Sequence, residues 1–199
     1  MGSARSRPSR PLAAREAGGS GPVPGFKPEN ELEHALAADP ELLEGLAWGK
    51  PREGHPEGAV GEHVADLLRA LESWNEPEPR RSELRFMGLV HDSQKNRVQQ
   101  WRPKTGENHH AMRARRLAER YTGDERLLAT IEHHDRPYAI WRRVHRKGRP
   151  QDAQLDEMLA DIPDPALFMR FVELDGSCEG KKPEPVEWLR EELGRRGLL

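Results

Sequence analysis

Adjacent His91 and Asp92 end an apolar run in the stretch GLVHDSQK, which extends from Gly88 to Lys95. An imidazole and a carboxylate are costly to bury unless a charge of opposite sign or a metal ion compensates them. Mixed imidazole and carboxylate ligands suit first-row divalent metals. Such a metal lowers the pKa of a bound water and supplies a nucleophile near neutral pH. The stretch therefore indicates a candidate site for metal-assisted chemistry.

Three further histidines and a second carboxylate occupy comparable positions elsewhere in the chain. Successive residues of a helix turn by about 100°, so a helical wheel shows which side chains share a face with an apolar stripe. His110 and His134 each continue such a stripe, whereas their neighbours His109 and His133 are rotated to one side. The side chains predicted to face one interior are His63, His91, His110, His134 and Asp175, with Asp92 beside them.

This set of side chains is larger than one catalytic metal requires. Any one of these histidines alone is more simply explained as a buried imidazole with a hydrogen-bond partner. Several imidazoles and two carboxylates together, with few lysines or arginines at inward positions, favour metal binding. Mononuclear catalytic zinc sites use three protein ligands. We therefore expect two divalent metals that share Asp92, drawn from Mn, Fe, Co, Ni and Zn, with Mg at a carboxylate-rich position.

Helical periodicity and capping residues predict the elements that carry these side chains. The helices are expected near residues 57–73, 81–92, 107–121, 124–134, 152–160, 164–177 and 184–194, with short helices after Pro28 and Pro40. No alternating pattern predicts a strand, so the expected fold class is all-α. Residues 1–28 are rich in Gly, Pro, Ser and Arg and are expected to form a disordered tail, with an organelle transit peptide as the alternative.

The charge balance and the cysteine count argue against several classes of protein. The 32 lysines and arginines nearly cancel the 34 aspartates and glutamates, so the formal charge is −2 and bulk charge does not predict nucleic-acid binding. Cys178 is the single cysteine, which excludes an internal disulfide and a cysteine-based zinc site and favours a cytoplasmic location. No apolar run approaches the ~20 residues of a membrane span, and no signal-peptide core follows the N-terminus.

The order of these histidines and aspartates resembles that of the HD superfamily of metal-dependent phosphohydrolases. The stretches that carry the resemblance are HPEGAVGEHV, GLVHDSQK, GENHHAMRARRLA, TIEHHDRP and FVELDG. They are most similar to the HD domain appended to bacterial tRNA nucleotidyltransferases, over roughly residues 51–182. The resemblance implies an all-α HD-domain helical bundle around a metal centre. Residues 29–199 would form it as a single, stand-alone domain without the nucleotidyltransferase part.

The resemblance also assigns roles to individual side chains. The matches to the family's metal ligands are, for the first metal, His63, His91, Asp92 and Asp175 and, for the second, His110 and His134. His133 is a further candidate ligand, because some relatives use both members of a His-His pair. Lys95 matches the lysine of the family motif His-Asp-x-Gly-Lys and would face a substrate phosphate or pair with a carboxylate. Ser93 and Gln94 depart from this motif, which leaves the place of Lys95 open.

The expected activity is hydrolysis of a phosphoester in a nucleotide or at a nucleic-acid end, such as a 2',3'-cyclic phosphate, by attack of a metal-bound hydroxide on phosphorus. Asp92 would orient the metals, while Lys95 and Arg113 would neutralise charge that develops on the phosphoryl group. A surface ion pair is the alternative role for Arg113. The competing functions are a di-iron oxygenase of HD type and a nucleotide- or RNA-binding module without turnover.

Basic residues alternate with aromatic residues on both sides of the expected ligands. Residues 96–110 contain Trp101 between basic residues. In residues 134–149, Arg136 is followed along the sequence by Tyr138 and Trp141. Arginine next to an aromatic ring is typical of contacts to nucleotide bases and phosphates, so we expect Arg136 to bind substrate. The alternative is a solvated basic face with the rings packed inward.

Overall fold

The computed structural model describes residues 21–51, 58–148, 152–178 and 180–199, except for the side chains of residues 146 and 147. Within these ranges the regular structure is helical, and the only extended pairing is an isolated bridge between Gly49 and Ala59. The all-α prediction is confirmed for this part of the chain. No helix in the same ranges is long and apolar enough to cross a membrane.

Ten α-helices and two short 3₁₀ turns follow one another along the described ranges. The α-helices are α1 (Glu31–Ala37), α2 (Pro40–Ala47), α3 (Val60–Trp74), α4 (Arg80–Val90), α5 (His110–Ala118), α6 (Glu125–His133), α7 (Arg136–Lys147), α8 (Asp152–Ala160), α9 (Pro165–Gly176) and α10 (Glu184–Arg195). The 3₁₀ turns are η1 (Lys95–Arg97) and η2 (Gly106–Asn108). All the helices expected from the sequence are present, with ends that differ by a few residues.

Helix α7 was not expected from the sequence. Its basic residues and the exposed ring of Tyr138 mask an apolar stripe on which Ile140 is buried. Pro137 lies in the first turn, where a missing N–H removes no intrahelical hydrogen bond. The stretch treated as a basic and aromatic segment is therefore a helix, and its side chains are distributed around a helical surface.

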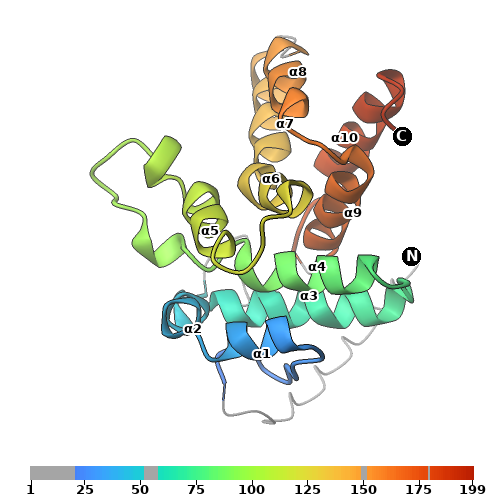
Figure 1. Ribbon diagram of the computed structural model, residues 1–199. Helices are drawn as coiled ribbons and strands as arrows, with labels where there is room; N and C mark the ends of the chain where they lie inside the picture. Colours follow the sequence, from blue (N-terminus) through green and yellow to red (C-terminus); the bar gives the residue numbers. More distant parts are fainter. Residues whose placement is uncertain (1–20, 52–57, 149–151, 179) are drawn as a thin grey trace, which may run out of the picture.

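Two layers of helices meet at α9 (Figure 1). Helices α3 and α4 lie side by side, with α1 and α2 packed beneath them, while α7 and α8 extend away on the opposite side. Helix α9 contributes Leu167 and Phe171 to the buried cluster around α3 and α4. Its next face contributes Phe168 and Met169 to a second buried cluster with α7, α8 and α10. The fold therefore carries α9 through the junction of both apolar clusters.

Two glycines allow close approaches that position the end of α4. A Cβ at Gly88 would lie 2.7 Å from a methyl carbon of Leu67, so the absent side chain lets α4 pack tightly on α3. A Cβ at Gly45 would lie 1.7 Å from the backbone oxygen of Ser93, so α2 supports the turn that follows Asp92. The chain around His91 and Asp92 is therefore braced by backbone contacts on two sides.

Aspartate caps define where two of the helices begin. Asp39 accepts hydrogen bonds from the backbone N–H groups of Glu41 and Leu42 at the start of α2, and Asp164 accepts one from Leu167 at 2.9 Å at the start of α9. A proline follows each cap at the first helical position, where its fixed φ suits the helix. The cap therefore determines the residue at which α9 begins. Because the helix is regular, it also determines the face on which later residues of α9, such as Asp175, lie.

Residues 21–28 correct the expected extent of the disordered tail. Val23 is buried and Phe26 packs against the main apolar cluster, while Arg85 donates a hydrogen bond to the backbone oxygen of Lys27 at 3.1 Å. The high Gly and Pro content of this stretch concealed two apolar anchors. The remainder of the expected tail, residues 1–20, lies outside the described residues.

Candidate metal centre

Five helices bring the sequence-predicted ligands to one place in the interior. His63 lies on α3, His91 and Asp92 follow the last residue of α4, and Asp175 lies near the end of α9. Two further side chains come from the first residue of α5 and the residue after α6, namely His110 and His134. These elements pack against one another, so residues far apart in sequence converge.

Asp92 is at the centre of this convergence. Its Oδ1 lies 3.3 Å from Nε2 of His110 and 3.6 Å from Nε2 of His134. Its Oδ2 lies 3.5 Å from Nε2 of His91. Asp175 completes the other side, because its Oδ1 lies 2.9 Å from Nε2 of His63 and 3.8 Å from Nε2 of His91.

The potential ligand atoms form three groups, of which two share Asp92. The first group contains His63, His91 and Asp92, the second contains Asp92, His110 and His134, and the third contains His109, His110 and Asp135; in each group the ligand atoms lie within 4.8 Å of one another. The residues are buried or nearly so. These His and Asp clusters could bind metal ions, and two of them share Asp92, whereas Asp175 belongs to none of the three.

Hydrogen bonds orient two of the imidazoles toward the carboxylates. Nδ1 of His91 donates to the backbone oxygen of Gly88 at 2.9 Å, and Nδ1 of His134 donates to that of Ile131 at 2.7 Å. In each ring this bond leaves Nε2 directed at Asp92. Metal-binding histidines commonly donate their second nitrogen to a backbone carbonyl in this way, which fixes the ring and the lone pair.

Several buried polar atoms at the centre lack a hydrogen-bond partner. They include Nε2 of His91, Nε2 of His110 and Oδ1 of Asp92. An unsatisfied buried polar atom costs about 1–3 kcal/mol, and the cost is larger for a charged group. The unpartnered atoms face one another around Asp92, so a cation placed among them would satisfy all three. The donor set therefore fits divalent metals.

The protonation states differ between the imidazoles within each group that contains Asp92. Burial lowers the pKa of His91 and of His110, which are neutral at pH 7 with a free lone pair. Burial opposes a charge on His63 as well, but hydrogen bonds to Asp175 and Cys178 and the charge of Asp175 raise its pKa to about 10. Burial likewise opposes a charge on His134, yet its interaction with Asp92 and the charges of Asp135 and Asp175 raise its pKa. In the first group a metal would therefore have to displace a proton from His63, whereas His91 has its lone pair free.

Both carboxylates are ionised despite their burial. Burial opposes the ionised form of Asp92, but the charge of Lys95 and the surrounding imidazoles hold its pKa well below its ordinary value. Burial acts similarly on Asp175, where the charge of Lys181 and the hydrogen bond from His63 hold the pKa well below its ordinary value. Ionised carboxylates and neutral imidazoles are the states in which these groups bind metals.

The neighbouring histidines His109 and His133 use both ring nitrogens elsewhere. Nδ1 of His109 accepts a hydrogen bond from the N–H of Ala111 at 3.3 Å, so its proton is on Nε2, which lies 3.4 Å from Asp135. Nδ1 of His133 accepts from Arg136 at 3.2 Å, so this ring too carries its proton on Nε2. Neither arrangement leaves a lone pair for the groups around Asp92. The structure places His133, a predicted ligand, outside all three groups.

Lys95 contacts the carboxylate that the two groups share. The turn after Asp92 continues into η1, and Nζ of Lys95 donates a hydrogen bond to Oδ2 of Asp92. Ser93, which departs from the expected motif, is buried and donates its hydroxyl to the backbone oxygen of Val90 at 2.8 Å. The altered turn therefore still brings Lys95 to the centre.

Two charged residues of the site were missed by the sequence analysis. Nζ of Lys181 lies 3.5 Å from Oδ1 of Asp175. Asp135 lies 3.7 Å from Nε2 of His110, and although burial opposes its ionisation, hydrogen bonding to His109 and the nearby imidazoles lower its pKa to about 2. Asp135 directly follows His134 and was visible as a carboxylate, whereas Lys181 lies after α9 where no periodicity indicates its direction.

A cavity of about 560 Å³, here called the site cavity, opens onto these residues. Its walls include Asp92, Lys95, His110, His134, Asp175 and Lys181. Tyr138 on α7 also lines the cavity and is about half exposed. A volume of this size accommodates a small organic ligand, and the lysines make the wall suitable for an anion.

The remaining predicted contacts lie away from the site cavity. Neither Arg113 nor Arg136 lines it. Arg136 lines a separate cavity, and Nε of Arg113 is buried without a hydrogen-bond partner. Trp101 is 81% exposed, which contradicts the alternative that its ring packs inward. Trp141 stacks on Tyr138 with 6.0 Å between ring centroids.

The arrangement as a whole can bind cations among imidazoles and carboxylates and present an anionic ligand to two lysines. Comparison of the chain with models of known protein families, with curated proteins and with solved structures finds no significant match.

Proposed function

We propose that this protein is a metal-dependent phosphohydrolase with an HD-type helical bundle. Its substrate would be a nucleotide or a nucleic-acid end that carries a phosphoester, such as a 2',3'-cyclic phosphate. The observation that carries the proposal is the set of unpartnered buried atoms on His91, Asp92 and His110, which face one another beside Lys95. Metal ligands and a cation at one cavity wall are the parts that phosphoester hydrolysis requires.

Two divalent metals would be held by the two groups of side chains that share Asp92. The ligands would be, for the first metal, His63, His91, Asp92 and Asp175 and, for the second, Asp92, His110 and His134. Ions such as Mn, Fe, Co, Ni or Zn, or Mg at the position richer in carboxylates, lower the pKa of water toward ~7 and polarise phosphoryl oxygens when bound. Asp92 would fix the spacing of the two positions, because it belongs to both groups.

The lysines would bind the phosphoryl group of the substrate. Lys95 contacts Asp92 and Lys181 lies beside Asp175, so each ammonium is held at the edge of the ligand groups by a carboxylate. A metal bound to Asp92 or Asp175 would weaken the attraction between that carboxylate and its lysine. The lysine could then donate a hydrogen bond to a phosphoryl oxygen of the substrate. Ammonium groups at these positions stabilise negative charge that increases as the phosphoester is attacked.

The half-exposed ring of Tyr138 would contact the organic part of the substrate. Tyr138 lies on the wall of the site cavity, and its stacking on Trp141 orients the ring. Aromatic rings bind nucleobases by stacking with little sequence preference. This supports a nucleotide over a simple phosphate ester without defining the base.

The proposal is tested by phosphate release and metal content measured on the same preparation. Wild type is incubated with Mn, Ni, Co, Zn or Mg and a panel of mono-, cyclic and triphosphate nucleotides, in parallel with Asp92→Ala and with His34→Ala as a control at an exposed histidine. We expect release by wild type and by the control but not by Asp92→Ala. Equal release by all three would refute the proposal.

The same samples discriminate between the competing functions. Bound iron together with oxygen consumption and no phosphate release would instead support a di-iron oxygenase. Stoichiometric nucleotide binding without turnover in every metal would support a binding module. The three lysines that line the site cavity, Lys95, Lys181 and Lys182, favour an anionic substrate over the neutral one that an oxygenase would take.

A further inference from the structure

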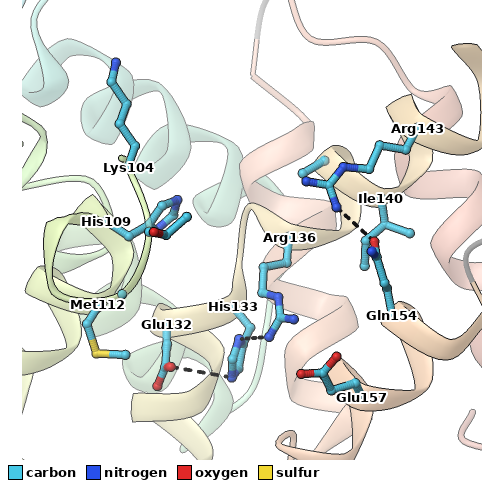
Figure 2. Close-up of a pocket in the computed structure, with 13 residues that line it drawn as sticks. Lys104, His109, Met112, Glu132, His133, Arg136, Ile140, Arg143, Gln154 and Glu157 are labelled. Atoms are coloured by element: carbon cyan, nitrogen blue, oxygen red, sulfur yellow. Dashed lines mark hydrogen bonds and ion pairs between the residues drawn. The ribbon is translucent and has the colours of Figure 1, made fainter. Parts of the chain in front are cut away.

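A second cavity of about 550 Å³ lies among α5, α6, α7 and α8 and is lined by His109 and His133 (Figure 2). We call it the basic cavity. Its charged lining residues are Lys104, Arg136, Arg143, Glu132 and Glu157. None of the residues that line it also lines the site cavity, so the two are separate binding volumes.

The arginines of the basic cavity have neutral partners. Nη1 of Arg136 donates to Nδ1 of His133 at 3.2 Å, and a ring that accepts at this nitrogen balances no charge. Nη1 of Arg143 donates to the side-chain oxygen of Gln154 at 2.9 Å. Figure 2 shows Arg136 and Arg143 toward one side of the cavity, while the ammonium of Lys104, an exposed residue, points away from them. The described contacts of the two arginines leave their charges without a carboxylate partner.

Two acidic residues also line this cavity. Glu132 lies 3.9 Å from Nε2 of His133 and accepts a hydrogen bond from Arg115 at 3.0 Å, and Arg115 also pairs with Glu119 and Glu125. Glu157, on α8, is the other carboxylate of the lining. Three cations against two carboxylates leave an excess of positive charge, and the two arginines with neutral partners favour an anionic ligand.

The rest of the wall is apolar. Ile140 and Ala139 on α7 and Met112 on α5 line the cavity between the charged groups. Arginine binds phosphate oxygens in a planar, bidentate manner, and a methionine and aliphatic surface suits the flat or apolar body of an organic molecule. Cavities of roughly 300–1,000 Å³ with apolar walls and a few fixed polar groups are typical of small-molecule sites.

We propose that the basic cavity binds an organic phosphate, with its phosphate on Arg136 and Arg143 and its organic body against Met112 and Ile140. This site is distinct from the metal centre and does not depend on the proposed hydrolase activity.

Binding is tested by calorimetric titration of the full chain in excess EDTA, which removes divalent metals. The probes are adenosine monophosphate, which has both a phosphate and an organic body, adenosine, which lacks the phosphate, and inorganic phosphate, which lacks the body. We expect one adenosine monophosphate per chain, with adenosine and inorganic phosphate each binding at least tenfold more weakly.

Variants then locate the site. Arg136→Gln combined with Arg143→Gln is expected to weaken adenosine monophosphate binding at least tenfold, and Arg136→Lys to retain part of it. Arg142→Gln, on the same helix but outside the cavity lining, is the matched control. Because Arg143 is exposed, Arg143→Gln alone should leave the fold intact, which circular dichroism checks, so its effect on adenosine monophosphate binding can be measured in a folded protein.

Lys95→Gln combined with Lys181→Gln separates the two cavities. This pair is expected to leave metal-free binding of adenosine monophosphate unchanged. Loss of binding in the lysine pair and its persistence in the arginine pair would move the ligand to the site cavity and overturn the proposal. It is also overturned if no adenosine monophosphate binds at millimolar concentration, or if inorganic phosphate binds equally well.

Discussion

Arg85 and Glu33 are buried as deeply as His91 and Asp92, yet the two pairs differ in how their polar atoms are satisfied. Nε and Nη2 of Arg85 donate to the two carboxylate oxygens of Glu33 at 2.7 and 2.8 Å, and Nη2 also reaches the backbone oxygen of Lys27. At the metal centre, in contrast, Nε2 of His91 and Oδ1 of Asp92 have no hydrogen-bond partner.

The difference separates a structural cluster from a functional one. A bidentate arginine and carboxylate pair contains its own counter-charge and needs nothing from solution. At the metal centre, hydrogen-bond acceptors of His91 and Asp92 face one another, which is unfavourable unless a proton or a metal lies between them. Such unsatisfied buried groups are tolerated where a ligand compensates for them. Both clusters hold helices together, but only the one around Asp92 has unpartnered atoms that a bound cation could satisfy.

Replacement of Asp92 should have the largest effect on activity. Asp92→Asn retains the volume but removes the carboxylate that both ligand groups share. We expect bound metal to fall in both positions and phosphate release to fall by about 10³-fold or more, equivalent to about 4 kcal/mol of transition-state stabilisation. Metal analysis and a phosphate assay on the folded variant measure both. Retention of two metals with full activity would show that Asp92 is not a shared ligand.

Replacement of Arg85 should have the largest effect on stability. Arg85→Met leaves Glu33 buried without its counter-charge, and breaking a buried ion pair from one side costs about 3–5 kcal/mol in the free energy of unfolding. The double variant Arg85→Met, Glu33→Leu should recover most of this loss. Urea unfolding measures each free energy. A double variant as unstable as the single one would mean that packing, and not the unpaired charge, dominates.

Metal should stabilise the two clusters unequally. At a free metal concentration 100-fold above Kd, binding to the folded state alone adds about 2.7 kcal/mol per site to the free energy of unfolding. We expect this increment in wild type and in Arg85→Met, since the Arg85 cluster takes no part in metal binding. Asp92→Asn should show little of it. Thermal unfolding with and without EDTA compares the three proteins, and an equal increment in all of them would place the metal elsewhere.

Each of the two pairs of adjacent histidines contains one ring near Asp92 and one ring that bonds elsewhere, so replacing each in turn tests which ring binds metal. His110→Ala should lose one metal of two, whereas His109→Ala should keep both and lose only the cap that its Nδ1 provides to α5, at a cost of about 1 kcal/mol. His134→Ala and His133→Ala form a second matched pair. Metal stoichiometry decides. Loss of a metal in the His109 or His133 variant would mean that the rings exchange hydrogen-bond partners on metal binding.

Helical periodicity selected two of the histidines that lie beside Asp92, but His133, which it placed to one side of the apolar stripe, is buried as deeply as His134. His110 and His134 each continue an apolar stripe, and the structure brings both to Asp92 while their neighbours bond elsewhere. Periodicity is a local property of one helix, so it shows which face is buried. It does not show which buried faces meet, and the proximity of Asp175 to His63 depended on the family resemblance for its interpretation.

The features that were missed depend on tertiary contacts. Lys181 lies after α9, where direction is set by packing and not by a repeating pattern. Helix α7 was missed although Ile140, Trp141 and Val144 follow a helical spacing, because the basic and aromatic residues around them were interpreted as a substrate-binding segment. Val23 was assigned to a disordered tail by the composition of its neighbours, although it is buried and Phe26 packs against the same apolar cluster.

Asp39 is a carboxylate whose charge is stabilised by protein groups alone, and its replacement should have the smallest effect of those predicted here. Burial opposes its ionisation, but the hydrogen bonds from Tyr121, Leu42 and Glu41 and the charge of Arg120 outweigh it and lower the pKa below the ordinary value of 3.8. Because the pKa is lower in the folded state than in the unfolded state, the stabilisation is present above the unfolded pKa and is lost as pH falls through the folded pKa. Asp39→Asn keeps a side chain that caps α2 and should therefore cost no more than about 1 kcal/mol at pH 7. The difference in the free energy of unfolding between wild type and variant should shrink as the pH is lowered to 3, and a difference that stays constant would assign the role of Asp39 to capping alone.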